Sequence, residues 1–185
     1  MGTSLFVLGG ARSGKSRFAL ASQHGHRRVA FLATAQAGDA DMAARIARHQ
    51  AERPGHWRTV EEPVDLVARL GEIAPTVDAV VVDCLTLWIA NLLLRGDGDA
   101  AIVKAADALA ATVAGRPATL TLVSNEVGLG VHPPTGDGLR FRDVLGAVNQ
   151  RVAAACDRVV LLVAGLPLTL KDSRRSVLDD VIDAP

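Results

Sequence analysis

The chain has 185 residues, of which 49% are hydrophobic and 3% aromatic, and its formal net charge is +0. This length fits one α/β domain with a sizeable core and is short for two. The neutral charge and the scarcity of aromatic residues argue against a nucleic-acid binder, which needs a basic surface or a stacking platform. Cys84 and Cys156 follow no metal or redox spacing, which indicates a cytoplasmic protein. No apolar run has the length of a membrane span, and none has the pattern of a signal peptide.

Short apolar runs alternate with segments of helical periodicity along the chain. The runs do not alternate with polar residues, which is typical of strands buried on both faces of a parallel sheet. The pattern therefore predicts a doubly wound α/β fold in a single domain. One further run, at residues 166–170, contains Pro167 and is expected at a sheet edge. Strands are expected at 5–8, 29–32, 77–82, 120–123 and 159–163, and helices at 17–23, 39–53, 64–73, 85–94, 100–114 and 140–155.

The first predicted strand leads directly into GGARSGKS at residues 9–16. This sequence fits the phosphate-loop pattern, in which glycines let successive amides point at phosphates, Lys15 reaches the β and γ oxygens, and Ser16 ligates Mg²⁺. A helix is expected directly after it, so the helix N-terminus adds partial positive charge to the same anion site. The motif predicts a nucleotide-binding P-loop NTPase fold of the RecA-like type.

Ligands of doubly wound sheets bind beyond the carboxyl ends of the strands. Asp83 ends one predicted strand, where a P-loop enzyme places an acid that holds Mg²⁺, although Asp83 also suits the N-cap of the next helix. Glu126 follows another strand and either touches the nucleotide or metal or stabilises the glycine-rich loop at 127–138. Residues 172–185 are charged and have no apolar pattern, so we expect a domain at 1–171 and a loosely held tail.

His49 differs from the other histidines because it lies within a predicted helix. On the helix expected at 39–53 it shares a face with Met42, Ile46 and Arg53. Periodicity alone favours a partly buried histidine that is satisfied by a neighbouring carbonyl or carboxylate. Its function therefore has to be judged together with the surrounding motifs.

Several blocks of the chain, taken together, resemble the bifunctional adenosylcobinamide kinase / adenosylcobinamide-phosphate guanylyltransferase family of cobalamin biosynthesis. The resemblance extends from the first strand to about Lys171 and rests on the order and spacing of the blocks. The blocks are GGARSGKS at 9–16, MAARIxxHxxxRP at 42–54, HWRTVEE at 56–62, DCLT at 83–86, SNEVGLG at 124–130 and FRDVLGxVNQRVA at 141–153.

The resemblance implies two reactions and a homotrimer. ATP or GTP first phosphorylates the aminopropanol hydroxyl of adenosylcobinamide. GMP from GTP is then joined to the resulting adenosylcobinamide phosphate, which yields adenosylcobinamide-GDP and pyrophosphate. The family motif places the histidine that carries GMP covalently at His49, and an imidazole is a good nucleophile for the α-phosphate.

The resemblance also implies the residues around the nucleotide. His49 and Lys15 are expected to be catalytic, and Ser16 and Asp83 to ligate Mg²⁺. Glu61 is a candidate to accept hydrogen bonds from guanine. The residues expected at the nucleotide are Gly9, Gly10, Ala11, Arg12, Ser13, Gly14, Lys15, Ser16, Ala33, Thr34, Ala35, Gln50, Ala51, Glu52, Arg53, Glu61 and Asp83.

Two other functions remain compatible with the phosphate loop. One is a small P-loop kinase or ATPase without a covalent histidine. The other is a nucleotide-gated binding module in which the loop at 128–138 changes state with the bound nucleotide. Trp88, on the helix expected at 85–94, lies either in a self-association surface or in the core.

Overall fold

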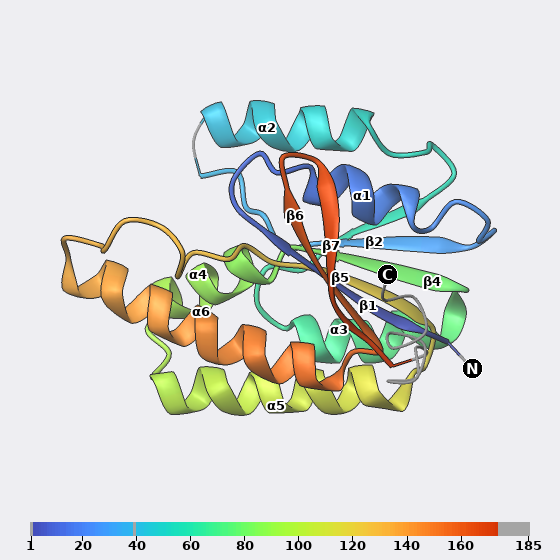
Figure 1. Ribbon diagram of the computed structural model, residues 1–185. Helices are drawn as coiled ribbons and strands as arrows, with labels where there is room; N and C mark the ends of the chain where they lie inside the picture. Colours follow the sequence, from blue (N-terminus) through green and yellow to red (C-terminus); the bar gives the residue numbers. More distant parts are fainter. Residues whose placement is uncertain (1, 39, 174–185) are drawn as a thin grey trace, which may run out of the picture.

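The computed structural model describes residues 2–38 and 40–173, which form one seven-stranded sheet covered by helices on both faces (Figure 1). The strand order is β3-β2-β4-β5-β1-β6-β7, so β1 lies inside the sheet between β5 and β6. All neighbours pair in parallel except β6 and β7. The strands are β1 (Ser4–Gly9), β2 (Val29–Ala33), β3 (Arg58–Glu61), β4 (Ala79–Asp83), β5 (Thr119–Val123), β6 (Arg158–Val163) and β7 (Leu166–Asp172).

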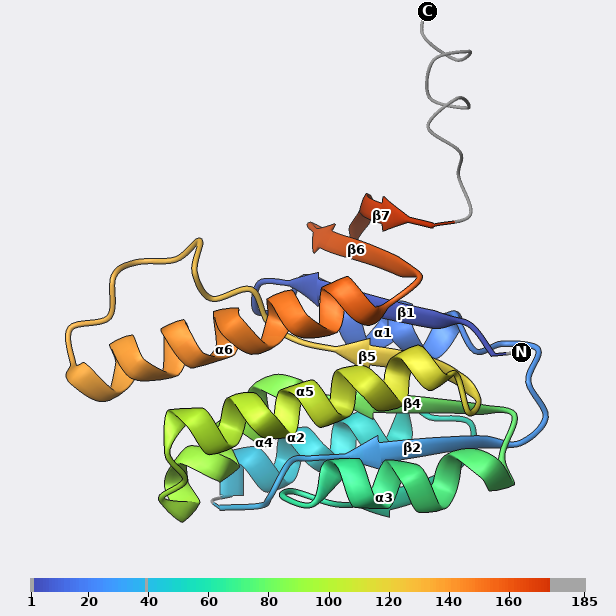
Figure 2. The same ribbon diagram turned by 90° about the horizontal axis from the view of Figure 1, so that it is seen from below.

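The helices divide between the two faces of the sheet. α3 to α6 cover one face, and α1 and α2 lie over the other (Figures 1 and 2). The expected doubly wound, single-domain α/β architecture is therefore confirmed. The helices are α1 (Lys15–Ala21), α2 (Ala40–Ala51), α3 (Leu66–Ile73), α4 (Leu85–Arg95), α5 (Asp99–Gly115) and α6 (Gly136–Ala155), with a short 3₁₀ turn at Ala74–Thr76.

The central strands contribute to cores on both faces of the sheet. In β1, Phe6 and Leu8 pack against the helices of one face, whereas Val7 packs with residues of the other. This two-sided burial explains why these strands are continuous apolar runs. Trp88 is buried in the larger core, where its indole Nε1 donates to the carbonyl of Val64 at 2.8 Å. The core interpretation of Trp88 is therefore correct.

Several elements differ from their expected bounds by one or two residues, and β3, β4 and α6 differ for reasons that the structure shows. β3 was not predicted, because only Val60 among its residues is even half-buried, as an edge strand allows. β4 begins at Ala79 rather than at residue 77, since Asp78 is held by Arg28, whose backbone N–H donates to the carboxylate at 2.9 Å. α6 begins at Gly136, four residues before the expected start, because the hydroxyl of Thr135 caps it by accepting from the Gly138 N–H.

β7 lies at the sheet edge, as its proline predicted, and extends to Asp172. The Asp172 carboxylate forms an ion pair with Arg158 of β6 at 3.0 Å, so this residue belongs to the hairpin. Ser173 is also described, and the rest of the predicted tail, residues 174–185, lies outside the described residues. Within residues 2–38 and 40–173, none of the helices combines the length and the hydropathy that crossing a membrane requires.

Candidate nucleotide site

The phosphate loop joins the end of β1 to the start of α1. Gly14 caps α1 in the left-handed region, with φ 95°, which favours glycine. At Gly9 a Cβ would lie 2.6 Å from both the Leu162 carbonyl oxygen and Ser13 Oγ, so no side chain fits. Lys15 is buried, and its Nζ donates to the Gly10 carbonyl at 2.6 Å. The ammonium group is thus folded over the loop, in the position from which a P-loop lysine reaches phosphate.

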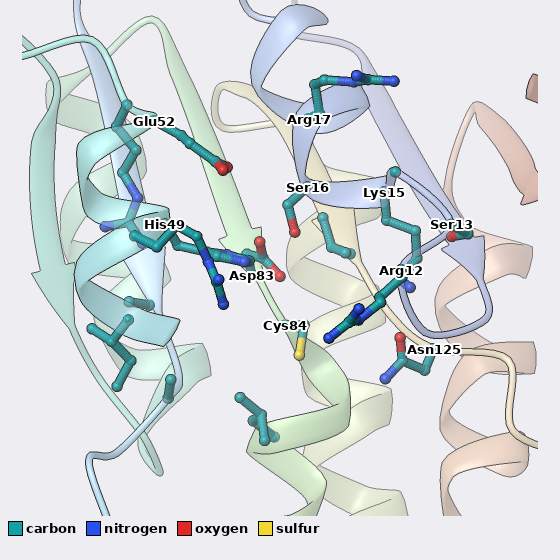
Figure 3. Close-up of a pocket in the computed structure, with 18 of the residues that line it drawn as sticks. Arg12, Ser13, Lys15, Ser16, Arg17, His49, Glu52, Asp83, Cys84 and Asn125 are labelled. Atoms are coloured by element: carbon teal, nitrogen blue, oxygen red, sulfur yellow. The ribbon is translucent and has the colours of Figure 1, made fainter. Parts of the chain in front are cut away.

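A cavity of about 790 Å³ opens beyond the carboxyl ends of the strands, between the phosphate loop and α2 (Figure 3). This volume lies in the range of small-molecule and cofactor sites. Most of the residues expected at the nucleotide meet there. Those that line the cavity are Ala11, Arg12, Ser13, Gly14, Lys15, Ser16, Ala33, Ala35, His49, Gln50, Glu52, Arg53, Glu61 and Asp83.

Gly9, Gly10, Thr34 and Ala51 were expected at the nucleotide but do not line the cavity. The two glycines shape the loop backbone, and Ala51 is exposed on α2. Thr34 is fully buried, and its hydroxyl donates to the Cys84 carbonyl at 2.7 Å and accepts from the Cys84 N–H at 2.9 Å. Thr34 therefore links the residue after β2 to the residue after β4 through two hydrogen bonds.

The cavity also contains residues that were not predicted as site residues. Cys84 and Asn125 follow the ends of β4 and β5, where the rule for doubly wound sheets expects ligands to bind, although neither was assigned to the site. Gly165 comes from the β6–β7 turn and donates its N–H to the Ser13 carbonyl at 3.1 Å, a contact that no local pattern indicates. The additional lining residues are Arg17, Phe31, Ile46, Arg48, Cys84, Leu87, Val123, Asn125, Ala164 and Gly165.

His49 faces the cavity from α2, opposite Arg12, Lys15 and Ser16 of the phosphate loop (Figure 3). The residue is half-buried. Within residues 2–38 and 40–173, no carbonyl or carboxylate is hydrogen-bonded to its ring, so the satisfied-histidine alternative finds no support there. The imidazole is positioned to meet a ligand in the cavity.

Arg53 follows the end of α2 and connects it to the sheet. Its guanidinium carbon lies 3.5 Å from the centroid of the Phe31 ring, a cation–π contact, and its NH1 donates to Thr59 Oγ1 at 3.3 Å. Burial lowers the pKa of the guanidinium, an effect that the nearby Asp83 and Glu61 carboxylates oppose. The side chain remains charged at neutral pH, because an arginine pKa starts far above 7.

Ser16 and Asp83 bring oxygen ligands to opposite sides of one gap, with the Ser16 hydroxyl facing the Asp83 carboxylate (Figure 3). A hydroxyl and a carboxylate are ligands that Mg²⁺ prefers, usually together with substrate phosphates. Cys84, not Asp83, is the N-cap residue of α4, and no side-chain hydrogen bond caps that helix. The N-cap alternative for Asp83 is thus wrong, and this donor set fits a magnesium ion.

The structure gives Glu126 a structural role and makes the Cys84 thiol unreactive. Glu126 does not line the cavity, and its Oε1 accepts from the Gly128 N–H at 2.9 Å, so it stabilises the glycine-rich loop. Burial raises the pKa of the Cys84 thiol to about 11, an effect that the Asp83 charge reinforces. At neutral pH this thiol is protonated and weakly nucleophilic.

A phosphate loop at the end of an inner strand of a doubly wound sheet, with an acid at the end of a second strand, defines a P-loop nucleotide-binding protein. Residues 5–170 match the family model described as cobinamide kinase / cobinamide phosphate guanyltransferase. The chain belongs to this family, which is a family of enzymes. The family resemblance and the enzyme class expected from the sequence are therefore confirmed.

Relatives of similar length match almost the whole chain. It is 48% identical over 172 residues to the bifunctional adenosylcobalamin biosynthesis protein CobP of Pseudomonas aeruginosa, which covers 89% of this chain and 95% of that protein. It is 42% identical over 181 residues to the bifunctional adenosylcobalamin biosynthesis protein CobU of Salmonella typhimurium, covering 90% and 99% respectively.

One solved structure supports the fold. It is described as a prototypical ATPase from the type III secretion system of pathogenic bacteria and has a TM-score of 0.56 at 10% identity. The match covers 91% of this chain but only 57% of that chain. At this identity the similarity supports the P-loop ATPase fold and says nothing about substrate.

Proposed function

We propose that this enzyme phosphorylates adenosylcobinamide with a nucleoside triphosphate and then transfers GMP from GTP to the product, giving adenosylcobinamide-GDP and pyrophosphate. The observation that carries the proposal is one cavity in which the phosphate loop and His49 face each other (Figure 3). Family membership over residues 5–170 supplies the substrates. A phosphate cradle alone would serve any kinase, whereas an imidazole on the opposite wall of the cavity suits nucleotidyl transfer.

The proposed transfer consists of two displacements at the α-phosphorus of GTP. A ring nitrogen of His49 attacks this phosphorus, a P–N bond forms, the bond to the oxygen that bridges to the β-phosphate breaks, and pyrophosphate leaves. A phosphate oxygen of adenosylcobinamide phosphate then attacks the same phosphorus and breaks the P–N bond. The histidine is thereby regenerated, and the two anionic substrates never have to react directly.

The phosphate loop serves both reactions in this proposal. Its amides and Lys15 hold the triphosphate and stabilise the charge that develops on the phosphoryl oxygens. Ser16 and Asp83 would hold Mg²⁺, which neutralises phosphate charge when it is bound. Lys15→Ala is expected to impair both reactions, because both depend on the same positioning.

Incubation with α-labelled GTP tests the histidine. The wild-type protein is expected to incorporate the label as an acid-labile GMP adduct. The His49→Ala variant is expected to incorporate no label while it keeps its kinase activity. His24→Ala is the matched control, since this exposed histidine does not line the cavity. A label that persists in His49→Ala would refute the assignment. Wild-type protein that phosphorylates the substrate without any label would instead identify a kinase without a covalent histidine.

We further propose that the working enzyme is a cytoplasmic homotrimer that uses Mg²⁺, ATP and GTP. The exposed leucines of β7, Leu166, Leu168 and Leu170, together with Val163 of β6, support self-association, because they form an apolar surface on an edge hairpin. Light scattering tests this state, and a monomer at micromolar concentration would contradict it.

A further inference from the structure

Asn125 lines the cavity at the end of β5, but the proposed chemistry gives it no role. We propose that its carboxamide donates a hydrogen bond to the terminal phosphate of the bound nucleoside triphosphate. Asn125 is then the residue that distinguishes a triphosphate from a diphosphate. This inference rests on the proposed function only for the identity of the nucleotide.

The sheet places Asn125 beside the start of the phosphate loop. The backbone N–H groups on either side of it bond to β1, that of Ser124 to the Val7 carbonyl at 3.0 Å and that of Glu126 to the Gly9 carbonyl at 3.1 Å. Strand alternation turns Val123 and Asn125 to the same face, and both line the cavity. In Figure 3 the Asn125 amide lies close to Arg12 and to the loop that carries Lys15.

The strand order indicates which phosphate Asn125 meets. β5 lies between β1, which leads into the phosphate loop, and β4, which ends at Asp83. Ser16 and Asp83 would hold a magnesium ion, which would neutralise charge on the terminal phosphates of the nucleotide. The side chain at the end of the intervening strand therefore faces the part of the cavity in which the terminal phosphate would lie.

Neighbouring side chains fix the backbone of Asn125 and leave its carboxamide unused. Its N–H donates to Thr86 Oγ1 at 2.8 Å, and its carbonyl accepts from Asn149 Nδ2 at 3.0 Å. Thr86 and Asn149 are themselves buried, on α4 and α6. These contacts hold the residue in place without involving its side chain.

Across residues 2–38 and 40–173, no protein group is hydrogen-bonded to the Asn125 side chain. A half-buried amide that offers two donors gains most from an acceptor supplied by a ligand. A neutral donor also suits this position, since the adjoining walls already carry the positive charge of Lys15 and the negative charge of Asp83.

Equilibrium binding of GDP and of a non-hydrolysable GTP analogue, each with Mg²⁺, tests the inference without turnover. Asn125→Ala is expected to weaken binding of the triphosphate about tenfold or more, the size of one hydrogen bond to a charged group, and to change GDP binding less than twofold. Asn125→Asp should weaken binding of the triphosphate further, because a carboxylate repels phosphate. Glu126→Gln is the matched control and should bind both nucleotides like the wild type, since Glu126 does not line the cavity.

Unchanged affinity for the triphosphate, or an equal loss for both nucleotides, would overturn the role of Asn125. Should Asn125→Ala be poorly folded, as judged by its melting temperature, the nearly isosteric Asn125→Asp decides the question. The two proposals fail independently. A missing GMP label with intact triphosphate discrimination refutes the transferase, whereas a labelled protein whose Asn125 variants still discriminate refutes this inference.

Discussion

Glu61 ends β3 and faces the cavity from the side away from the phosphate loop. β3 and β1 are separated by β2, β4 and β5, which at about 4.8 Å per strand spacing places the two strands about 19 Å apart. A nucleotide that extends along this sheet edge from the phosphate loop brings its base toward Glu61. A carboxylate there can accept hydrogen bonds from N1 and the exocyclic amine of guanine, whereas adenine has no N1–H to donate.

Glu61→Gln is therefore expected to lower the use of GTP relative to ATP by about tenfold, the cost of weakening one hydrogen bond to a charged acceptor. Initial rates of the kinase step with each nucleotide measure this ratio. Glu52→Gln, which removes a cavity-lining acid just beyond the end of α2 instead, should leave the ratio unchanged. An unaltered ratio in Glu61→Gln would mean that another group recognises the base.

At the scale of single residues, chemistry was easier to predict from the sequence than geometry. Lys15 and Ser16 were expected at the nucleotide because the phosphate-loop spacing has one dominant use, and Asp83 because it ends a strand; all three line the cavity. Thr34 was placed at the nucleotide by family resemblance, but its hydroxyl lies in the interior and binds Cys84. The direction of a side chain after a strand end depends on tertiary contacts, which no local pattern reports.

The element that carries His49 contributes little to the core. None of the described side chains of α2 is fully buried, and Ile46 and His49 are only half-buried. Arg53 stacks on Phe31 just beyond the helix end and fixes it to the sheet. α2 can therefore open locally at a free-energy cost well below that of global unfolding.

Ala47→Gly on α2 and Ala108→Gly on α5 provide a matched comparison, since both alanines are exposed and each change costs about 1 kcal/mol of helix propensity. Ala108→Gly should lower the melting temperature by about 2–4 °C, because α5 packs Ile102, Leu109 and Val113 into the core. Ala47→Gly should accelerate amide exchange within α2 by about fivefold and leave the melting temperature unchanged. Equal thermal effects would show that α2 unfolds with the rest of the domain.

Elements were predicted well wherever burial was two-sided. Five strands have continuous apolar sequences because helices cover both faces of the sheet, namely β1, β2, β4, β5 and β6. β3 lies at an edge with most of its residues exposed, so its sequence contains no such signal.

Over the whole molecule, Asp157 connects three distant parts of the chain. Its carboxylate accepts from the N–H and hydroxyl of Ser4 at 2.9 and 3.0 Å, and it pairs with Arg116, which follows α5. Burial alone would raise the pKa of Asp157, but the hydrogen bonds from Ser4 and Arg116 outweigh it and lower the pKa below its usual 3.8. The charged form is therefore the one that stabilises the fold.

Asp157→Asn should lower the free energy of unfolding at pH 7 by about 1–3 kcal/mol, because it removes charged hydrogen bonds in the interior. The difference in the free energy of unfolding between wild type and variant is fully present above the unfolded-state pKa of Asp157. It decreases as the pH falls below that pKa and is lost below the folded-state pKa. Denaturant unfolding of both proteins at pH 7 and at pH 3 measures this difference. Asp107→Asn breaks an ion pair with Arg151 in which the Asp side chain is 62% exposed, and should cost less than 1 kcal/mol. A similar loss for both variants would contradict the role of Asp157.

The inner position of β1 also determines when the enzyme becomes competent during its synthesis. β1 leaves the ribosome before β5 and β6, yet Val7 pairs with Val123 of β5 on one side and with Val160 of β6 on the other. The turn after β6 must then bring Gly165 against Ser13. A nascent chain thus exposes the whole GGARSGKS motif before that motif has the neighbours that shape it, and we expect nucleotide affinity only after β5, β6 and the turn that follows β6 have been synthesised.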